Sequence, residues 1–440
     1  MLNSLSKPFV RVVERWMPDP FIFAALLTLL TFLLAITLAG QSPIDAVNGW
    51  GGKFWSLTSF TTQIAMTLLT GYALANTPFS QKCLKGLVGL VSKPFYAYAM
   101  VCFVAGVGSL VSWAIGLIVG AFLARETARA CKERGMVVHF PLLVASGYAG
   151  FVLFGQGLSS SIALKVAETD HFLVEKMGVL PASETIFSNF SMAVVLLVLI
   201  TLPLIMAATA PKSEACIQFS GAEIDEATSE EGEGTPAHKI SSMRLWNLLI
   251  GGLGLAFLVS EFVIAGKGLT LNLINMVFLV SGILLTSSPL HYVRLMTEGG
   301  KTLGPILLQY PFYAGIMGLM ASSGLTQIFS GWVVAFASAE TLPFWSMISA
   351  GFVNLFVPSA GGQWAVQGPI MIDAAQQLGA DINRVTLGVA MGDQWSNMIQ
   401  PFFTIPALAI AGLHVRHIMG YCFIAFIWTG LIFGTALLLF

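Results

Sequence analysis

Oxygen-rich side chains surround an acid inside one of the apolar segments of the second half of the chain. The acid is Asp393, and Gln394, Ser396 and Asn397 follow it. An ionisable group at membrane depth is by default functional and paired, and burial disfavours the charged form of a carboxyl group. We therefore expect Asp393 to take up a proton or, together with Asn397, to hold Na⁺. The alternative is a structural acid that accepts bonds from nearby backbone N–H groups.

A second set of polar residues precedes that acid and could bind an anion. Hydroxyl, amide and bare backbone N–H donors together satisfy a carboxylate without arginine, and such weak holding suits a carrier that must release its cargo. For the glycines of the set, close helix packing is the alternative. We expect Ser359, Gly361, Gly362 and Gln363 to lie at the bend of a helical hairpin, with Gln367 beyond them. The expected substrate-binding residues here are Ser359, Gly361, Gly362, Gln363, Trp364 and Gln367.

Serines near two breaks in the first half supply further candidates. Ser109 and Ser112 lie close to an expected bend and could contact the substrate, as could Ser159 and Ser160. Ser161 is a candidate for ion coupling. Serines inside a membrane helix often bond back to their own backbone, and that alternative stays open.

Three tryptophans could line the apolar side of a cavity for a short alkyl chain. These are Trp113, Trp364 and Trp395, and plain packing would use them equally well. Lys165, His171 and the basic loops are expected to be solvated flanks of membrane segments.

Composition indicates the class of protein that must position these groups. The chain has 440 residues, 56% hydrophobic and only 10% charged, with a mean hydropathy of +0.81. Soluble proteins carry roughly 25% charged residues. The sequence therefore predicts an all-α polytopic membrane protein. A net charge of −1 gives no reason to expect nucleic acid as a partner, and the lipid bilayer is the expected one.

Apolar stretches of about 20 residues, long enough to cross about 30 Å of hydrocarbon, predict the spans. Lys and Arg concentrate in loops that would then be cytoplasmic, which places the N-terminus inside. Two further stretches, 94–123 and 343–379, are expected to form helical hairpins. The nine predicted full spans cover residues 20–39, 57–75, 140–163, 186–209, 245–265, 271–290, 303–321, 385–412 and 418–439.

An acidic, glycine-rich segment divides the chain into two halves. We expect residues 1–209 to form the N-terminal half, with spans one to four and the first hairpin. Residues 244–440 form the C-terminal half, with spans five to nine and the second hairpin. The segment 210–243 between them has few large apolar groups and is predicted to be a disordered cytoplasmic linker.

A weak internal sequence repeat relates the two halves. Gly-Gly-Lys at 51–53 precedes span two, and Gly-Gly-Lys at 299–301 precedes span seven. The cluster at 155–160 likewise corresponds to 392–397, and the loop charges orient the matching spans oppositely. This is the pattern of an inverted repeat with interrupted helices, with which many secondary transporters build a midplane site. Half-helix N-termini aimed at the centre favour an anion there.

Long blocks of the chain resemble the bacterial short-chain fatty acid transporter family, which takes up acetoacetate and butyrate. The segment 210–243 falls outside the resemblance. The blocks that carry it are RWMPDPFIFAALLTLLTF (15–32), SWAIGLIVGAFLARETAR (112–129), QYPFYAGIMGLM (309–320), NLFVPSAGGQWAVQGP (354–369), GDQWSNMIQPFF (392–403) and PALAIAGLHVRHIMGYC (406–422).

The resemblance implies uptake of small monocarboxylates across the bacterial inner membrane by secondary active transport. It implies no cofactor beyond a coupling ion, H⁺ or Na⁺. More distantly the chain is similar to anion and ion transporters with paired re-entrant hairpins, among which homodimers are common.

Other classes of protein fit the sequence less well. A membrane enzyme would need a catalytic motif, and no H-E-x-x-H, G-x-S-x-G or Walker A pattern occurs. A channel is a third class. It would pass an ionic current without exchanging substrate across the membrane, whereas a carrier shows saturable transport and exchange. Among carriers, one for larger carboxylates such as dicarboxylates is the alternative. The lack of a second cationic group at either hairpin bend argues against a doubly charged cargo.

Overall fold

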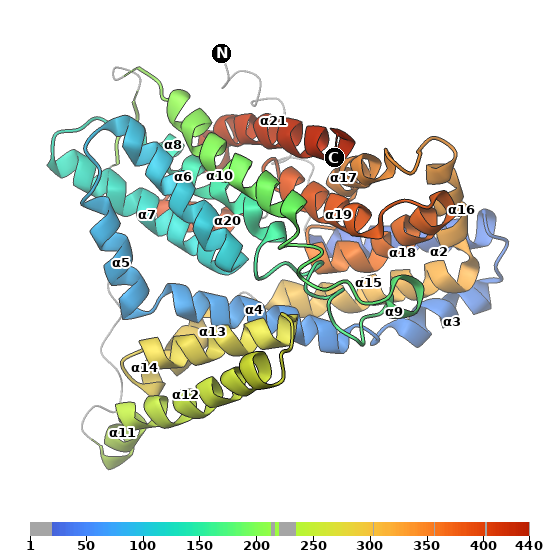
Figure 1. Cartoon of the computed structure of the whole chain (residues 1–440), viewed down its shortest axis with the longest axis horizontal. Helices are drawn as coiled ribbons and strands as arrows, with labels where there is room; N and C mark the ends of the chain where they lie inside the picture. Colours follow the sequence, from blue (N-terminus) through green and yellow to red (C-terminus); the bar gives the residue numbers. More distant parts are fainter. Residues whose placement is uncertain are drawn as a thin grey trace.

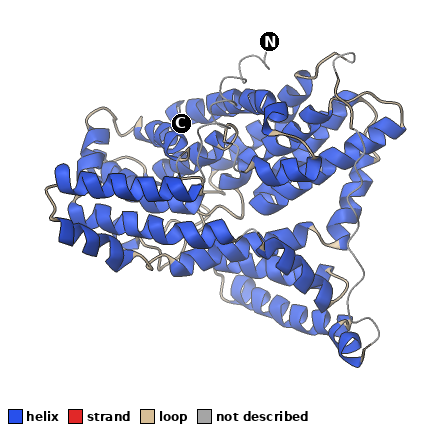
Figure 2. Ribbon diagram, turned by 180° about the vertical axis from the view of Figure 1, so that it is seen from behind, coloured by secondary structure: helices blue, strands red, loops and turns tan. Residues whose placement is uncertain are grey.

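Helices make up the regular structure of the chain throughout the part that a computed structural model describes (Figure 2). That part comprises residues 20–212, 216–219, 235–301, 303–355, 357–400 and 403–439. The predicted all-helical class is confirmed. The basic N-terminal segment, on which the predicted orientation partly rests, lies outside the described residues.

The longer helices correspond to the predicted spans or to arms of the hairpins. Their bounds are α2 (Pro20–Thr37), α4 (Thr58–Ala75), α6 (Pro94–Val111), α7 (Trp113–Glu133), α8 (Phe140–Gly150), α10 (Asn189–Ala208), α12 (Arg244–Val259), α13 (Leu271–Leu285), α15 (Gly304–Ser323), α17 (Leu342–Val353), α18 (Ala360–Leu378), α19 (Ile382–Ser396) and α21 (Val415–Leu439).

Several short helices occur between the predicted spans, where the sequence predicted only loops or an unbroken span. The short helices are α3 (Pro43–Lys53), α5 (Pro78–Val88), α9 (Val174–Met177), α11 (Pro236–Ser241), α14 (Pro289–Gly300), α16 (Leu325–Val334) and α20 (Thr404–Ala411). Four of them, α3, α5, α11 and α14, begin with a proline directly after a capping residue. This combination starts helices because proline suits the first position and the cap accepts an N–H bond.

The nine predicted full spans are not confirmed. Among the described residues, four helices are long and apolar enough to cross a membrane, or five if the bent pair α14–α15 counts as one span. Other apolar helices, such as α13 and α17, have 10–17 residues. Interruptions divide several of the predicted spans into shorter helices.

The first hairpin reverses direction at a single residue, Ser112. Its backbone is extended, and it ends α6 and starts α7. A Cβ added to Gly108 would lie 3.4 Å from the Cα of Gly116, and one added to Gly120 would lie 3.1 Å from the Cβ of Ala105. The residue pairs are centred on Ser112, so α6 and α7 run antiparallel. Gly108, Gly116 and Gly120 lie inside these helices, where they allow close approach.

The second hairpin turns over residues 354–359, between α17 and α18. The side-chain amide of Gln363 donates to the carbonyl oxygen of Ala350, and that of Gln367 donates to the hydroxyl of Ser349. These contacts between residues equally far from the turn make α17 and α18 antiparallel. Both predicted hairpins are therefore present as helix pairs.

Two predicted spans are interrupted. Span three consists of α8 and a 3₁₀ segment, η1 (Phe151–Gln156), and residues 157–173 after it are non-helical. Span eight ends as α19 at Ser396 and resumes as α20 at Thr404. The interruptions fall at the predicted clusters 155–160 and 392–397, although the predicted spans 140–163 and 385–412 are not continuous helices.

Helix packing in the first half recurs in the second. α3 packs against α15, and α14 packs against α4. α6 packs on α8 as α17 packs on α19, and α5 meets α7 as α16 meets α18. In Figure 1, α4 runs between the helices α5–α8 and the pair α13–α14, and it contacts α7, α13 and α14. Each half thus places a helical hairpin next to a broken helix.

The predicted disordered linker, 210–243, contains ordered parts. α11 occupies Pro236–Ser241. Further upstream, the Ile217 carbonyl accepts a hydrogen bond from Phe140 N–H, and the buried Phe219 ring lies 5.1 Å from that of Phe140. Residues 220–234 lie outside the described part. The prediction of disorder was wrong at these two places. It rested on the average composition of the segment, which does not show that a single side chain such as Phe219 can anchor it to the helices.

Candidate functional site

One buried asparagine joins the second hairpin to the broken helix α19. Asn354, the first residue after α17, donates from its side-chain nitrogen to the Asp393 carbonyl at 3.0 Å, the Ser396 hydroxyl at 2.8 Å and the Asn397 side-chain oxygen at 2.6 Å. Gln400 in turn donates to the Asn354 carbonyl at 2.9 Å. The predicted ion-coupling residues Asp393, Ser396 and Asn397 therefore lie together, around a residue that the sequence analysis did not select.

Asp393 occupies the last turn of α19 and is buried, with an exposed fraction of 1%. Within the described part of the chain, neither carboxylate oxygen has a hydrogen-bond partner. No backbone N–H group of the described residues donates to it, which argues against a backbone-bonded structural acid. An isolated buried carboxylate is costly unless it is neutralised, so this geometry suits a group that takes up a proton or a cation.

Other buried oxygens of the same hydrogen-bonded network lack donors. These are the side-chain oxygens of Asn354, Gln363 and Gln400, considered against all described residues. Hard cations prefer carboxylate and amide oxygens over nitrogen or sulfur ligands. The same residues contain no group of three or more His, Cys, Asp or Glu side chains placed to hold a metal ion. The side-chain oxygens around Asp393 are thus of the kind that hard cations prefer.

The predicted substrate-binding glutamines hold the second hairpin together. The Gln363 side-chain nitrogen also donates to the Gln367 side-chain oxygen at 2.9 Å. Both residues lie in α18 rather than at the bend where the sequence placed Gln363. Trp364 is fully buried, and its indole N–H has no partner among the described residues. That N–H is consequently a buried donor without an acceptor among the described residues.

The bend of the second hairpin presents its helix N-terminus to two tyrosines. Ser359 caps α18 by accepting a bond from Gly362 N–H, and its hydroxyl donates to that of Tyr310 at 2.9 Å. A Cβ on Gly361 would lie 2.7 Å from the Tyr310 oxygen, and one on Gly362 would lie 2.4 Å from the Tyr313 ring. Close packing, the alternative for these glycines, therefore operates whether or not their N–H groups bind an anion.

The first hairpin is tied to the break in span three. Ser159 accepts a bond from the backbone N–H of Trp113 at 2.8 Å, at the start of α7. Leu158 N–H donates to the Leu110 carbonyl at 2.7 Å. The Ser112 hydroxyl is buried there without a partner in the described part of the chain. Ser112 and Ser159 thus lie at one junction between the first hairpin and the break in span three.

The other serines of the first half act locally. Ser109 bonds to the Ala105 carbonyl of its own helix, as the alternative for membrane serines anticipated. Ser160 accepts a bond from Ala163 N–H at 3.2 Å, and Ser161 is buried beside it. The Ser109 hydroxyl thus bonds within α6 and not to the broken segment among the described residues. Of the four serines predicted to contact the substrate, Ser109 has the least structural support.

Gln394 connects the two broken spans. Its side-chain oxygen accepts a bond from Gly155 N–H at 2.7 Å, and its nitrogen donates to the Gln156 side chain at 3.0 Å. The Tyr148 hydroxyl donates to the Asn397 carbonyl at 2.6 Å. The clusters 155–160 and 392–397 are therefore in direct contact. They are the two clusters that correspond in the internal sequence repeat.

Trp113 and Trp395 pack against aromatic side chains rather than line a cavity. Trp395 stacks on Phe426 with ring centroids 4.3 Å apart, and its indole N–H donates to the Phe426 carbonyl. Trp113 lies 6.4 Å from the ring of Phe403. These contacts favour the packing alternative for both residues.

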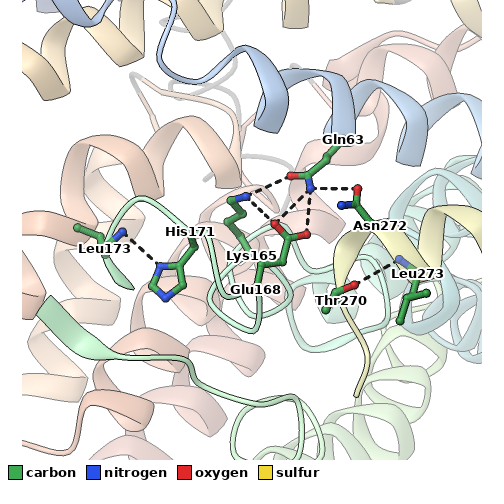
Figure 3. Close-up of polar contacts among 8 residues, drawn as sticks. All are labelled: Gln63, Lys165, Glu168, His171, Leu173, Thr270, Asn272 and Leu273. Atoms are coloured by element: carbon green, nitrogen blue, oxygen red, sulfur yellow. Dashed lines mark hydrogen bonds and ion pairs between the residues drawn. The ribbon is translucent and has the colours of Figure 1, made fainter. Parts of the chain in front are cut away.

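Two predicted solvated flanks are instead buried. Lys165 is 5% exposed and His171 is 1% exposed. Lys165 pairs with the buried Glu168, and Gln63 of α4 bonds to both (Figure 3). Sequence reasoning missed this group because 164–185 has the charge pattern of a loop. The only available signal was that Lys165 and Glu168 directly follow the serine-rich break.

Comparisons with known proteins agree over the whole chain. The family described as "Short chain fatty acid transporter" matches residues 1–440, including the segment that the resemblance left out. A protein of Escherichia coli K12 named "Putative short-chain fatty acid transporter" is 38% identical over 444 residues, covering 100% of both chains. A protein of the same name in Haemophilus influenzae is 37% identical and covers 98% of both.

Solved structures share the fold at low sequence identity. The Alcanivorax borkumensis YdaH transporter aligns with a TM-score of 0.63 at 15% identity, covering 95% of this chain and 98% of that one. Neisseria gonorrhoeae MtrF aligns with a TM-score of 0.55 at 15% identity and 97% coverage of both. The full-length match and the 37–38% identities place this chain in the short-chain fatty acid transporter family.

Proposed function

We propose that this protein takes up short monocarboxylates such as acetoacetate or butyrate across the bacterial inner membrane, driven by the inward movement of H⁺ or Na⁺. Membership of a transporter family supplies the class of activity. The observation that supports ion coupling is the buried Asp393 carboxylate without a hydrogen-bond donor.

The coupling step rests on the network around Asn354. When the ion is bound, its charge compensates Asp393, which lowers the cost of burying that carboxylate. Asn354 fixes the end of α19 relative to the second hairpin through three hydrogen bonds. Binding or release of the ion at Asp393 therefore changes the position of the second hairpin through Asn354. It also acts on the other broken span through Gln394.

The second hairpin bend is proposed to contact the substrate carboxylate. Ser359 and the first backbone N–H groups of α18 lie there, and the positive end of the helix dipole favours an anion. The bend, residues 354–359, contains no Lys or Arg. Uncharged donors bind a carboxylate weakly enough for release on the other side.

Two halves of opposite orientation are proposed to carry out alternating access. The recurring pairs, α3 with α15 and α14 with α4, support an inverted repeat because a twofold relation exchanges them. In this arrangement the N-terminus is cytoplasmic. A homodimer is the proposed assembly, by analogy with transporters that have paired hairpins.

Uptake into proteoliposomes tests the proposal. Purified protein is reconstituted, and labelled acetoacetate and butyrate are offered with a pH gradient or a sodium gradient imposed separately. One gradient is expected to drive accumulation above the equilibrium level, and unlabelled butyrate on the opposite side is expected to accelerate exchange. Current without exchange would indicate a channel, and preferential uptake of succinate would favour the carrier of dicarboxylates.

A further inference from the structure

A buried ion pair lies outside the network of Asp393 and has no role in the function proposed above. Lys165 and Glu168 are each 5% exposed, and the Lys165 ammonium lies 2.5 Å from a Glu168 carboxylate oxygen. Of the lysines in the described part of the chain, only Lys165 is buried. Both residues follow the break at 157–161 in a segment without regular secondary structure (Figure 3).

Polar side chains of α4 and α13 surround the pair on one side. The Gln63 side-chain nitrogen donates to both Glu168 oxygens, at 3.0 and 3.2 Å, and to the Asn272 side-chain oxygen at 3.0 Å. Its oxygen accepts a bond from Lys165 at 3.4 Å. Gln63 and Asn272 also line an open groove between α4 and α13. The charged pair is therefore one side chain away from that groove.

The other side of the pair faces the second hairpin. The Lys165 ammonium lies 5.5 Å from the centre of the Phe60 ring. That ring is 6.0 Å from the Tyr310 ring, and a Cβ on Gly361 would lie 2.8 Å from it. The Phe60 ring thus lies beside both the ammonium and the start of α18. Lys165 stands between a polar groove and the hairpin bend.

We propose that Lys165 receives the carboxylate of the substrate and that Glu168 occupies this position as an internal carboxylate when no substrate is bound. The inference rests on the proposed function and adds to it a positively charged position beside the second hairpin bend, which the carboxylate occupies before or after it contacts that bend. A substrate carboxylate has the same charge and oxygen geometry as that of Glu168, so it forms the same charge-assisted bonds to the ammonium. During the exchange Glu168 keeps its two bonds from Gln63.

The exchange also explains why a buried ammonium does not hold the substrate too tightly. A lone buried cation would bind an anion strongly and release it slowly, whereas a resident carboxylate competes for the same donor. Release then requires only that Glu168 return to Lys165. The alternative is a structural pair that merely holds the broken segment on α4.

Substitutions at the pair separate these two roles through butyrate uptake into proteoliposomes. Lys165→Gln is expected to raise the KM for butyrate by about tenfold or more, the loss of one charge-assisted hydrogen bond. Glu168→Gln removes the internal competitor and is expected to lower the KM. Lys165→Arg, which keeps the charge, is expected to retain part of the affinity.

The double variant Lys165→Gln/Glu168→Gln decides between the roles because it leaves neither charge uncompensated. If Lys165 binds substrate, the KM of the double variant for butyrate stays as high as that of Lys165→Gln. In the double variant, the uncharged analogue butyramide is then expected to inhibit butyrate uptake as strongly as unlabelled butyrate does. A wild-type KM in the double variant, or an equal rise of KM in Glu168→Gln and Lys165→Gln, would overturn the inference alone. Absence of butyrate and acetoacetate uptake by the wild type would overturn the proposed function and this inference with it.

Discussion

At the scale of single residues, the site is built from amide side chains rather than charges. Asn354 joins Asp393, Ser396 and Asn397 through one nitrogen. The sequence indicated Asp393 and its neighbours because an acid in an apolar segment is rare. It did not indicate Asn354, because an asparagine after a helix is ordinarily a turn residue, and only the three-dimensional arrangement shows what it bonds.

Asn354→Ala is expected to weaken both stability and transport. The substitution leaves the buried acceptors of Ser396 and Asn397 without their donor, and each such loss costs about 1–3 kcal/mol. The melting temperature in detergent and the rate of butyrate uptake are both expected to fall. Asn383→Ala serves as the control, because Asn383 bonds to Glu184 in an exposed position. Equal behaviour of the two variants would contradict the role given to Asn354.

At the scale of elements, interruptions of helices decide the architecture. The sequence predicted both hairpins and both broken spans from clusters of Gly, Ser and Pro. It did not predict α3, α5 or α14, since their apolar runs are too short to stand out and their capping residues look like loop residues. It also placed Gln363 in the bend, whereas Ser359 caps the helix four residues earlier.

Close contact between α7 and α8 depends on two glycines that face each other. A Cβ on Gly147 would lie 2.5 Å from the Gly120 carbonyl oxygen. Gly147→Ala forces backbone to move and is expected to cost about 1–3 kcal/mol, the usual range for overpacking. A thermal unfolding measurement in detergent checks the expected lower melting temperature.

Gly252→Ala is the matched control for that substitution. Gly252 lies inside α12, and nothing is within 4 Å of an added Cβ. Alanine favours a helix over glycine by roughly 0.5–1 kcal/mol, so this variant is expected to melt no lower than the wild type. An unchanged melting temperature for Gly147→Ala would show that α7 and α8 do not pack as described.

At the scale of the whole molecule, composition and loop charge predicted a helical membrane protein in two halves. The structure does not confirm the nine predicted full spans, because hydropathy does not distinguish an unbroken helix from a helix, a break and a second helix. Lys165 shows the same limit for charge. A lysine next to acids resembles a solvated loop until its burial among Phe60, Gln63 and Glu168 is seen.

The opposite orientation of the halves is testable by labelling from one side. Lys53 and Lys301 each follow a Gly-Gly pair and are exposed, and the inverted repeat places them on opposite sides of the membrane. Lys53→Cys and Lys301→Cys are made separately in a background of Cys83→Ser and Cys216→Ser. A membrane-impermeant maleimide added to intact cells is expected to label Cys at 53 and not at 301. Labelling of both positions from outside would contradict the inverted repeat.

Ion coupling through the buried carboxylate is the central claim, and Asp393→Asn tests it most directly. The change keeps the size of the side chain and removes its charge. Wild-type and variant proteoliposomes receive the same ion gradient, and accumulation of labelled butyrate is measured in both. Gradient-driven accumulation is expected to fall in the variant to the level of protein-free liposomes. Accumulation equal to that of the wild type would contradict the account.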